Sequence, residues 1–421
     1  MRRSRGCTLC RARGDREQSQ ATARACRGGC AVRVLHVNKF AFARGGAEEY
    51  MFRLSDRQAE AGDEVAIFGS AGDVNTTTTS RRLFDFRVQD FHAATSTTSR
   101  LRAAREVLWS TRAATSLSQA IEDFRPDVVH VHNYAHQLSS SIIDLMREQG
   151  MPVVATAHDY KLICPAYVAN RKGQDCFACS HHVSAKLILD RCHHDDLSWS
   201  ALAAAEAVVV RSKRLTPDHI IAPSQYMADA LASSWVATIP ISMIRNPAES
   251  VGLRWRGGGS LLYVGRLSRE KGVEPLIQAA IEARIPLTVA GDGPLRGDLE
   301  RSSDPTIVTF VGHLPADELA RLRERCLAQI VPSEWPENAP LSALEAAIDG
   351  VPLIASPRGG LPEFANIGAR VSFMNEITGA SLQAAVRELD SRSGNMDLLR
   401  ETLSWSRHLR LVTEVYGRVT A

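Results

Sequence analysis

The fold is decided by a stretch that opens Val32-Arg33-Val34-Leu35-His36-Val37, an apolar run that predicts a buried strand. The run leads into a loop at 43–48, a helical stretch to about residue 61 and a second strand at 64–69. Beyond these, we expect strands at 128–132 and 153–158 with a helix at 139–149 between them. Alternating strands and helices are typical of a parallel sheet covered by helices.

A second alternation follows a break after Asn246-Pro247. Residues 256–259, Arg-Gly-Gly-Gly, are typical of a linker. Beyond them we expect strands at 261–265, 286–290, 307–311, 328–332 and 353–356 and helices at 273–283 and 315–326. The chain is therefore predicted to be an α/β protein with two doubly wound, Rossmann-like domains, at 32–250 and 259–403, facing a central cleft.

Length and composition exclude several classes of protein. The chain has 421 residues, 44% of them hydrophobic and 23% charged, so it is neither disordered nor a mini-protein. Its formal net charge is +3, but the first 30 residues alone contain eight Arg against Asp15 and Glu17. We expect residues 1–31 to be a disordered, Arg- and Cys-rich tail, and no nucleic acid as a partner.

The sequence also contains no candidate for a membrane-spanning helix or a signal peptide. No apolar run approaches the roughly 18 residues that a spanning helix needs, and the basic start is not followed by an apolar stretch. We therefore expect a cytoplasmic protein.

Gly45 and Gly46 open the helix that follows the first strand. Glycine lets backbone N–H groups come close to a phosphate, and the N-terminus of a helix provides a favourable field for it. Many strand-to-helix turns use glycine for their conformation alone, so the pair has two interpretations at this point.

Charged residues stand at two positions of the second domain where a ligand is expected. Arg266 follows a strand directly and Lys271 precedes the next helix, so two cations suited to a diphosphate would meet at the cleft; a solvated turn is the alternative. Glu337 lies in a loop, and Glu345 lies on an apolar helix that starts near Pro340. A carboxylate in such surroundings needs a hydrogen-bonding partner, and a pair of ribose hydroxyls suits Glu345.

Glu337 and Glu345 form a Glu-x7-Glu motif, one of five motifs that occur together in this chain. The others are Gly265-Arg266-Leu267, Lys271-Gly272, Gly291-Asp292-Gly293-Pro294 and Gly359-Gly360-Leu361-Pro362-Glu363. In this order and spacing they resemble the retaining glycosyltransferases of group 1, family 4, which have the GT-B fold. The resemblance covers about residues 32–421. It implies a nucleoside diphosphate sugar donor bound mainly by the second domain and an acceptor bound mainly by the first.

The resemblance also implies a role for each matching residue. Four of them are implied to be catalytic, namely His158 near the reacting centre, Glu337 facing the donor sugar, and Arg266 with Lys271 on the diphosphate. The donor-binding set adds Gly45, Gly46, Asn338, Ala339, Pro340, Leu341 and the ribose ligand Glu345. Residues 404–421 are similar to a last helix that crosses back to the first domain.

Three further histidines have a position but no assigned chemistry. His130 and His132 alternate on one strand and share a face, and we expect them to be structural. His132 is nearer the carboxyl end of that strand and could also reach the cleft. His313 follows a strand of the second domain, and we expect it on the nucleotide side.

Eight of nine cysteines fall into two clusters. Cys164, Cys176, Cys179 and Cys192, interspersed with histidines, lie in an expected insertion at 160–197. Their spacing fits either a tetrahedral structural zinc or free thiols. The tail cysteines, Cys7, Cys10, Cys26 and Cys30, fit either a small zinc module or an unstructured start, and Cys326 is expected in the core.

The predicted reaction is retaining transfer of a sugar to an acceptor hydroxyl, on a saccharide or lipid-linked acceptor, in surface polysaccharide or glycolipid synthesis. The chain contains no Asp-x-Asp pair, so Arg266 and Lys271 are expected to neutralise the diphosphate and catalysis to need no metal. Two alternatives are a sugar-nucleotide epimerase or phosphorylase of GT-B-like fold, and a zinc-dependent binding module.

A basic segment raises the question of membrane contact. Arg100, Arg102, Arg105 and Arg112 surround Trp109. This pattern fits a helix that lies on the anionic inner face of a membrane, or an ordinary solvated helix.

Overall fold

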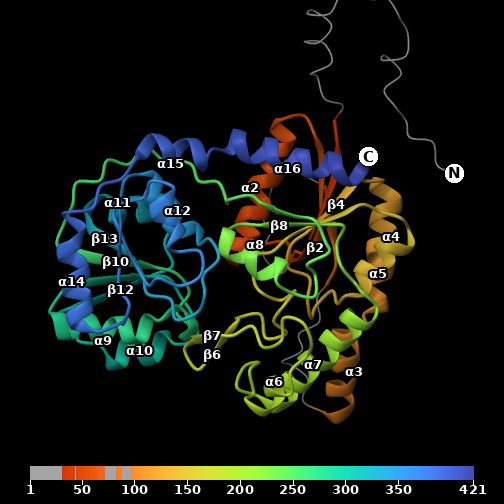
Figure 1. Cartoon of the computed structure of the whole chain (residues 1–421), viewed down its shortest axis with the longest axis horizontal. Helices are drawn as coiled ribbons and strands as arrows, with labels where there is room; N and C mark the ends of the chain where they lie inside the picture. The colour runs from red at the N-terminus through yellow and green to blue at the C-terminus, as the bar shows by residue number, and fades with distance from the viewer. Residues whose placement is uncertain (1–30, 43, 72–81, 88–95) are drawn as a thin grey trace, which may run out of the picture.

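The computed structural model describes residues 31–42, 44–71, 82–87 and 96–421, which form two α/β halves (Figure 1). The expected tail, apart from its last residue, lies outside the described residues, together with its cysteines Cys7, Cys10, Cys26 and Cys30. Among the described residues, no helix is both long enough and apolar enough to span a membrane.

The first half contains a sheet of seven parallel strands in the order β3-β2-β1-β4-β5-β8-β9. The strands are β1 (Arg33–Phe40), β2 (Glu64–Ser70), β3 (Arg82–Asp85), β4 (Val128–Val131), β5 (Val153–Thr156), β8 (His219–Ala222) and β9 (Ile241–Met243). Strands β1, β2, β4 and β5 lie where the sequence predicts them. The pattern did not indicate β3, β8 and β9, which have only three or four residues each.

Helices cover this sheet on both faces, as the alternation predicted. They are α2 (Gly46–Glu60), α3 (Thr97–Leu108), α4 (Thr111–Phe124), α5 (Ser141–Glu148), α7 (Leu197–Ser212) and α8 (Gln225–Ala232). The segment between β5 and α7 forms a small hairpin, β6 (Asn170–Arg171) and β7 (Gln174–Asp175), and a short helix, α6 (Lys186–Leu189). In Figure 1 the hairpin lies between the two halves.

The second half also contains a parallel sheet, with six strands in the order β12-β11-β10-β13-β14-β15. The strands are β10 (Ser260–Val264), β11 (Leu287–Ala290), β12 (Val308–Gly312), β13 (Cys326–Val331), β14 (Leu353–Ala355) and β15 (Val371–Phe373). The helices are α9 (Val273–Ala283), α10 (Arg296–Ser302), α11 (Ala316–Arg325), α12 (Leu341–Ile348), α13 (Glu363–Asn366), α14 (Gly379–Leu389) and α15 (Met396–Thr402). Cys326 is buried in this core.

The last helix, α16 (Trp405–Thr420), runs from the second half across the first (Figure 1). Its Val412, Val415 and Tyr416 are buried against residues of β1 and β5, including Val34 and Val154. The end of the chain therefore belongs to the core of the first half.

In both sheets the strand order reverses beside the first strand, at β1/β4 and at β10/β13. In open α/β sheets such points leave a crevice at the carboxyl ends of the strands, where ligands bind. The two crevices face each other.

Candidate active site

A cleft of about 1010 Å³ lies between the carboxyl ends of the two sheets. Residues of both halves line it. The predicted site residues on its walls are Gly45, Gly46, His158, Arg266, Lys271, Glu337, Asn338, Ala339, Pro340 and Leu341, and His132 and His313 also reach it. Glu345 is not among the lining residues.

The two predicted cations stand on the wall formed by the second half. Arg266 follows β10 and is exposed, whereas the Lys271 side chain is 25% exposed. Lys271 ends a short 3-10 helix (Arg269–Lys271), and Gly272 follows it with φ 66°. A Cβ on Gly272 would lie 1.9 Å from the Pro332 oxygen, so glycine allows this turn to pack on the loop that carries Glu337.

Glu337 is held by a cation and a hydroxyl. Its Oε1 is 2.6 Å from Lys271 Nζ and accepts a hydrogen bond from Ser333 Oγ at 2.5 Å. Burial raises the pKa of Glu337, but the charge of Lys271 and the two hydrogen bonds outweigh it, so the pKa lies below its ordinary value. Helix α12 begins after Pro340 without a side-chain cap, so Glu337 is not a helix cap.

Asn338 ties the two halves together beside His158. Its Nδ2 donates to the Ala157 oxygen at 2.7 Å, and its Oδ1 accepts from Ser224 Oγ at 2.7 Å. Both ends of the side-chain amide are thus engaged with the first half. The Asn338 amide is therefore already paired and is not free to contact a donor.

The Gly359-Gly360-Leu361-Pro362-Glu363 motif forms a second tie between the halves. Glu363 accepts hydrogen bonds from the backbone N–H groups of Gln225 and Tyr226 at the start of α8. It also forms an ion pair with Arg245 at 2.6 Å. Sequence reasoning missed Ser224 and Arg245, because neither belongs to a motif and their partners lie more than 100 positions away.

Glu345 uses both carboxylate oxygens in ion pairs. Oε1 is 3.0 Å from Arg53 Nη1, on α2 of the first half, and Oε2 is 3.2 Å from Arg323 Nη2. Arg323 is buried, whereas Arg53 is partly exposed. A ribose at Glu345 would therefore replace the contact with Arg53 more easily than that with Arg323.

The glycine pair lies opposite the start of α12. A Cβ on Gly46 would make ordinary contact with Leu341, 3.7 Å away, and a Cβ on Gly45 would meet Glu48 at 3.6 Å. Gly45 has an extended backbone, and neither residue has a positive φ. The chain conformation therefore does not require glycine here, which favours the interpretation that a ligand approaches this backbone closely.

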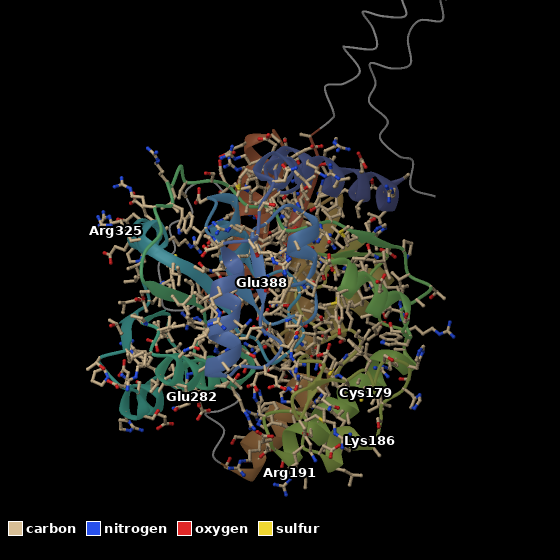
Figure 2. All side chains as sticks on the ribbon, turned by 60° about the vertical axis from the view of Figure 1, so that its left-hand side comes forward. Cys179, Lys186, Arg191, Glu282, Arg325 and Glu388 are labelled. Carbon is tan, nitrogen blue, oxygen red and sulfur yellow. The ribbon has the colours of Figure 1, made fainter. Side chains whose placement is uncertain are left out.

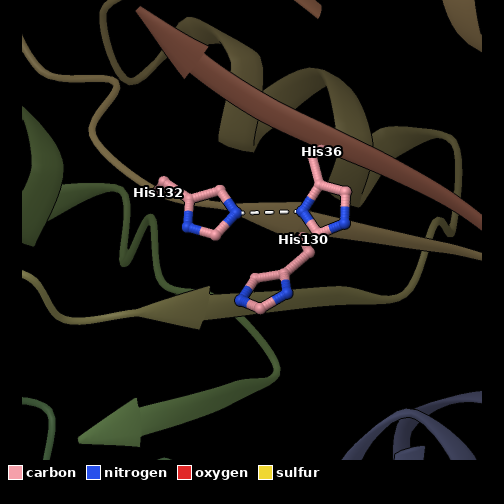
Figure 3. A group of neighbouring side chains, drawn as sticks. All are labelled: His36, His130 and His132. Atoms are coloured by element: carbon pink, nitrogen blue, oxygen red, sulfur yellow. Dashed lines mark hydrogen bonds between the residues drawn. The ribbon is translucent and has the colours of Figure 1, made fainter. Parts of the chain in front are cut away.

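His158 follows β5 and belongs to a cluster with His36 on β1, His130 on β4 and His132 directly after β4. Its Nε2 is 3.0 Å from His132 Nδ1, and His132 Nε2 is 3.0 Å from His36 Nδ1 (Figure 3). Burial lowers the pKa of His158 to about 3, so the ring is neutral at neutral pH. It is suited to hydrogen bonding rather than to carrying a proton.

Three of these histidines, His36, His130 and His132, are close enough to consider a metal ion (Figure 3). Within the described parts of the chain, they alone bring three ligand atoms within 4.8 Å of one another. However, all six ring nitrogens already have hydrogen-bond partners within the protein. These residues therefore fit a structural network, as the sequence predicted for His130 and His132, and not a metal site.

Two charged residues of the cleft were missed by sequence reasoning. Lys39, near the end of β1, is half-buried, and desolvation lowers its pKa while the nearby Asp159 and Glu48 carboxylates oppose that shift. Asp159 follows His158, and burial raises its pKa while the Lys161 N–H and the charges of Lys39 and Lys161 oppose the rise. The sequence signal that could have found Lys39 was its position just after the apolar run at 32–37, where a cation would stand near the cleft.

The four insertion cysteines are each partly buried and form no disulfide within the described part of the chain. Cys164, Cys179 and Cys192 pack against the same small cluster, formed by Ala166, Leu187 and Ala204. In Figure 2, Cys179 and Lys186 lie in the same part of the molecule, apart from Glu282 and Glu388 of the second half.

Comparisons with known proteins agree with this geometry. Residues 44–249 match Glycosyltransferase Family 4, and residues 256–389 match Glycosyl transferases group 1. Glycogen synthase of Mycobacterium tuberculosis is 32% identical over 284 residues, 63% of this chain but only 60% of that protein's length. O-antigen chain mannosyltransferase C of Escherichia coli is 24% identical over 361 residues, 82% of each chain.

The fold is also found in a solved structure. Anabaena Alr3699/HepE, in complex with UDP and glucose, superposes with a TM-score of 0.62 at 14% identity, covering 92% of this chain and 99% of that one. Together with the two family matches, which between them span most of both halves, this settles the classification. The chain belongs to the group 1, family 4 glycosyltransferases and has their GT-B fold.

Proposed function

We propose that the protein transfers a glycosyl group, with retention, from a nucleoside diphosphate sugar to an acceptor hydroxyl. The observation that carries the proposal is the pair Arg266 and Lys271 on one wall of a cleft, with the Gly45-Gly46 backbone on the other. Two cations and a helix N-terminus suit a diphosphate, which gains negative charge as its bond to the sugar breaks.

The proposed chemistry is attack on the same face from which the diphosphate leaves. The bond between the anomeric carbon and the diphosphate oxygen breaks, and the acceptor oxygen forms the new bond to that carbon. The acceptor proton passes to the departing diphosphate oxygen, so no protein base is needed. Glu337, kept ionised by Lys271, would stabilise positive charge that develops on the sugar.

We further propose an acceptor in surface polysaccharide or glycolipid synthesis, handled at the inner face of the cytoplasmic membrane. The similarity to an O-antigen chain mannosyltransferase supports a polysaccharide acceptor. On α3, Leu101 is 67% exposed among the exposed Arg102 and Arg105, which suits a membrane surface. Trp109 does not belong to that surface, because the Lys213 ammonium covers its ring at 4.2 Å.

The proposal is tested with a panel of nucleotide sugars. We expect at least one donor to raise the melting temperature and, with a saccharide or a lipid-linked acceptor in anionic vesicles, to yield a glycoside whose anomeric configuration is that of the donor. Which acceptor reacts decides between the free and the membrane-bound substrate. Epimerised donor, or sugar release that depends on inorganic phosphate, would contradict transfer.

The ribose role of Glu345 predicts an effect mainly on donor binding. Glu345→Gln should raise the donor KM about ten- to hundredfold with a smaller change in kcat, because a hydrogen bond to a charged group contributes about 1.5–3 kcal/mol in ground and transition state alike. Arg53→Ala is the matched variant, because it frees Glu345 from a partly exposed ion pair. Such a pair contributes about 1 kcal/mol or less, so this variant should lower the donor KM by up to about fivefold. Steady-state kinetics would contradict the assignment if both variants raised the KM equally.

A further inference from the structure

A continuous chain of hydrogen bonds leads from His158 into the first half. Its members, in order, are His158, His132, His36, Gln58, Tyr416, His130 and Thr156, with neighbouring donor and acceptor atoms 2.7–3.0 Å apart. From Thr156 the chain continues through Tyr50 to His408, whose Nδ1 lies 2.9 Å from the backbone oxygen of Arg245.

The far end of the chain fixes the direction of every bond. A carbonyl oxygen only accepts, so His408 Nδ1 carries the proton, and His408 Nε2 accepts from Tyr50. Tyr50 has a single hydroxyl hydrogen, so its oxygen accepts from Thr156. By the same reasoning, Thr156 accepts from Nε2 of His130, and a neutral His130 then accepts at Nδ1 from Tyr416.

The same logic carries the direction through Gln58 to the cleft. The Tyr416 oxygen accepts from Gln58 Nε2 at 3.0 Å, which orients the amide so that Gln58 Oε1 accepts from His36 Nε2 at 2.7 Å. His36 Nδ1 then accepts from His132, and His132 Nδ1 accepts from His158 Nε2. His158 is left with an unprotonated Nδ1.

We propose that Gln58 is a positioning residue that fixes the tautomer of His158, so that this ring offers an acceptor nitrogen to a hydroxyl of the bound sugar. A flipped amide would reverse each bond between Gln58 and His158 and move the proton to Nδ1. The consequence for catalysis rests on the proposed function, whereas the tautomer itself does not.

The test is nuclear magnetic resonance of the full-length protein labelled with ¹⁵N-histidine, which reports the ring nitrogen that carries the proton. In the wild type, we expect His158 to be protonated at Nε2 and not at Nδ1. Gln58→Glu keeps an acceptor for His36 and should preserve that tautomer, with kcat/KM for transfer within about twofold of wild type. Gln58→Leu removes the acceptor and should give mixed tautomers, with kcat/KM lowered about two- to tenfold, as for one lost hydrogen bond.

Two further variants keep the result decisive. Tyr416→Phe leaves the Gln58 amide without its anchor and should also mix the tautomers, even if Gln58→Leu does not fold. Ser55→Ala removes a buried hydroxyl on α2 that donates to the Met51 backbone oxygen and takes no part in the chain of hydrogen bonds. This variant should leave the tautomer of His158 unchanged. A wild-type His158 protonated at Nδ1, or unmixed tautomers in both Gln58→Leu and Tyr416→Phe, would overturn the proposal. The predicted tautomer in a protein without transfer activity would instead count against the proposed function alone.

An independent observation concerns the insertion. The Cys164 sulfur accepts hydrogen bonds from the backbone N–H groups of Ala166 and Ala169, and it lies near the sulfurs of Cys176 and Cys179. Cys192 is near the same two sulfurs. Arg211, whose Nη2 donates to the Cys179 oxygen, places a positive charge beside Cys164 and Cys179. Burial outweighs these groups and raises the pKa of the Cys164 thiol to about 11 and that of the Cys192 thiol as well, so a metal ion would displace their protons as it binds.

We infer that Cys164, Cys176, Cys179 and Cys192 hold a structural zinc ion, because three of them pack on one small cluster and the fourth lies beside them. Zn–S bonds of about 2.3 Å place tetrahedral sulfurs about 3.8 Å apart, whereas within the described residues no three of these sulfurs lie within 4.8 Å of one another. Binding would therefore draw them together by side-chain rotation. The ion would hold the β6–β7 hairpin, which reaches the second half through Asn170 to the Glu334 oxygen at 2.6 Å and through Asp175 to Arg358 at 3.3 Å.

Elemental analysis of full-length protein never exposed to chelator tests this site. We expect about one zinc per chain, retained in a control with Cys7, Cys10, Cys26 and Cys30 all changed to Ser and lost, to less than about a tenth of an equivalent, in Cys176→Ser/Cys179→Ser. Wild-type protein reloaded with Co²⁺ should show the absorption of tetrahedral thiolate coordination, a readout that needs no variant to fold. The assignment would be overturned if zinc were lost with the tail cysteines but kept in Cys176→Ser/Cys179→Ser. It would also be overturned if the folded wild-type protein contained no zinc.

Discussion

Arg266→Ala is expected to lower kcat for sugar transfer about 30- to 1,000-fold while leaving the melting temperature unchanged. Removing one preorganised electrostatic donor from a developing charge weakens transition-state stabilisation by about 2–4 kcal/mol. The side chain is exposed on the cleft wall, so its loss leaves no buried group unpaired. Steady-state kinetics at saturating donor, beside thermal melting, measure both quantities.

Lys271→Ala should produce a loss of similar size, but through two contributions. Lys271 faces the cleft and also neutralises the buried Glu337, so its removal weakens the donor site and leaves a buried carboxylate unpaired. That second effect should lower the melting temperature, because breaking a buried pair from one side is strongly destabilising. Combining Lys271→Ala with Glu337→Gln should restore much of the stability and none of the turnover.

An exposed arginine elsewhere in the second half gives the matched control. Arg321 lies on α11 with a side chain that is 73% exposed and pairs with Asp317. Arg321→Ala should be neutral in both measurements, as expected for a surface ion pair. If Arg266→Ala and Lys271→Ala kept near-native turnover at saturating donor, these residues would not bind the diphosphate.

The strands and the chemistry at their ends could be predicted from the sequence because both are local properties. An apolar run such as residues 32–37 marks a buried strand, and a cation directly after such a run, as with Arg266, must stand at the edge of the sheet. Every predicted donor residue except Glu345 lines the cleft, and those of the 337–341 loop were implied by the family resemblance. Strand β9 was missed because its three residues are only partly buried or exposed and so form no apolar run.

The remaining parts of the site depend on contacts between distant segments, which leave no periodic signal. Gln58 and Tyr416 are 358 positions apart, and neither residue type suggests a role near a cleft. The motif identified Glu345 but not its ion pair with Arg53, which requires the two halves to be in place. Cysteine spacing likewise indicates possible ligands without the positions of their sulfur atoms.

Glu337→Gln is expected to lower kcat about 100-fold and to raise the donor KM much less. The change keeps size and some hydrogen bonding but removes the charge that would stabilise a cationic sugar in the transition state, an effect of the size found for other preorganised electrostatic groups. Ser333 and Lys271 hold the carboxylate in one place, so its position is set before the donor arrives. Steady-state kinetics with varied donor separate kcat from KM.

The pH dependence of stability distinguishes this electrostatic role from a loss of structure. Burial would raise the pKa of Glu337, but Lys271 and Ser333 bring it below the ordinary value of 4.5. Stability from this group is therefore complete above the unfolded pKa and is lost as the pH falls through the folded pKa. Glu337→Gln should remove that part of the acid sensitivity while the protein stays folded at neutral pH. Unchanged kcat in a variant with a lowered melting point would show that Glu337 holds the loop together and does not act on the sugar.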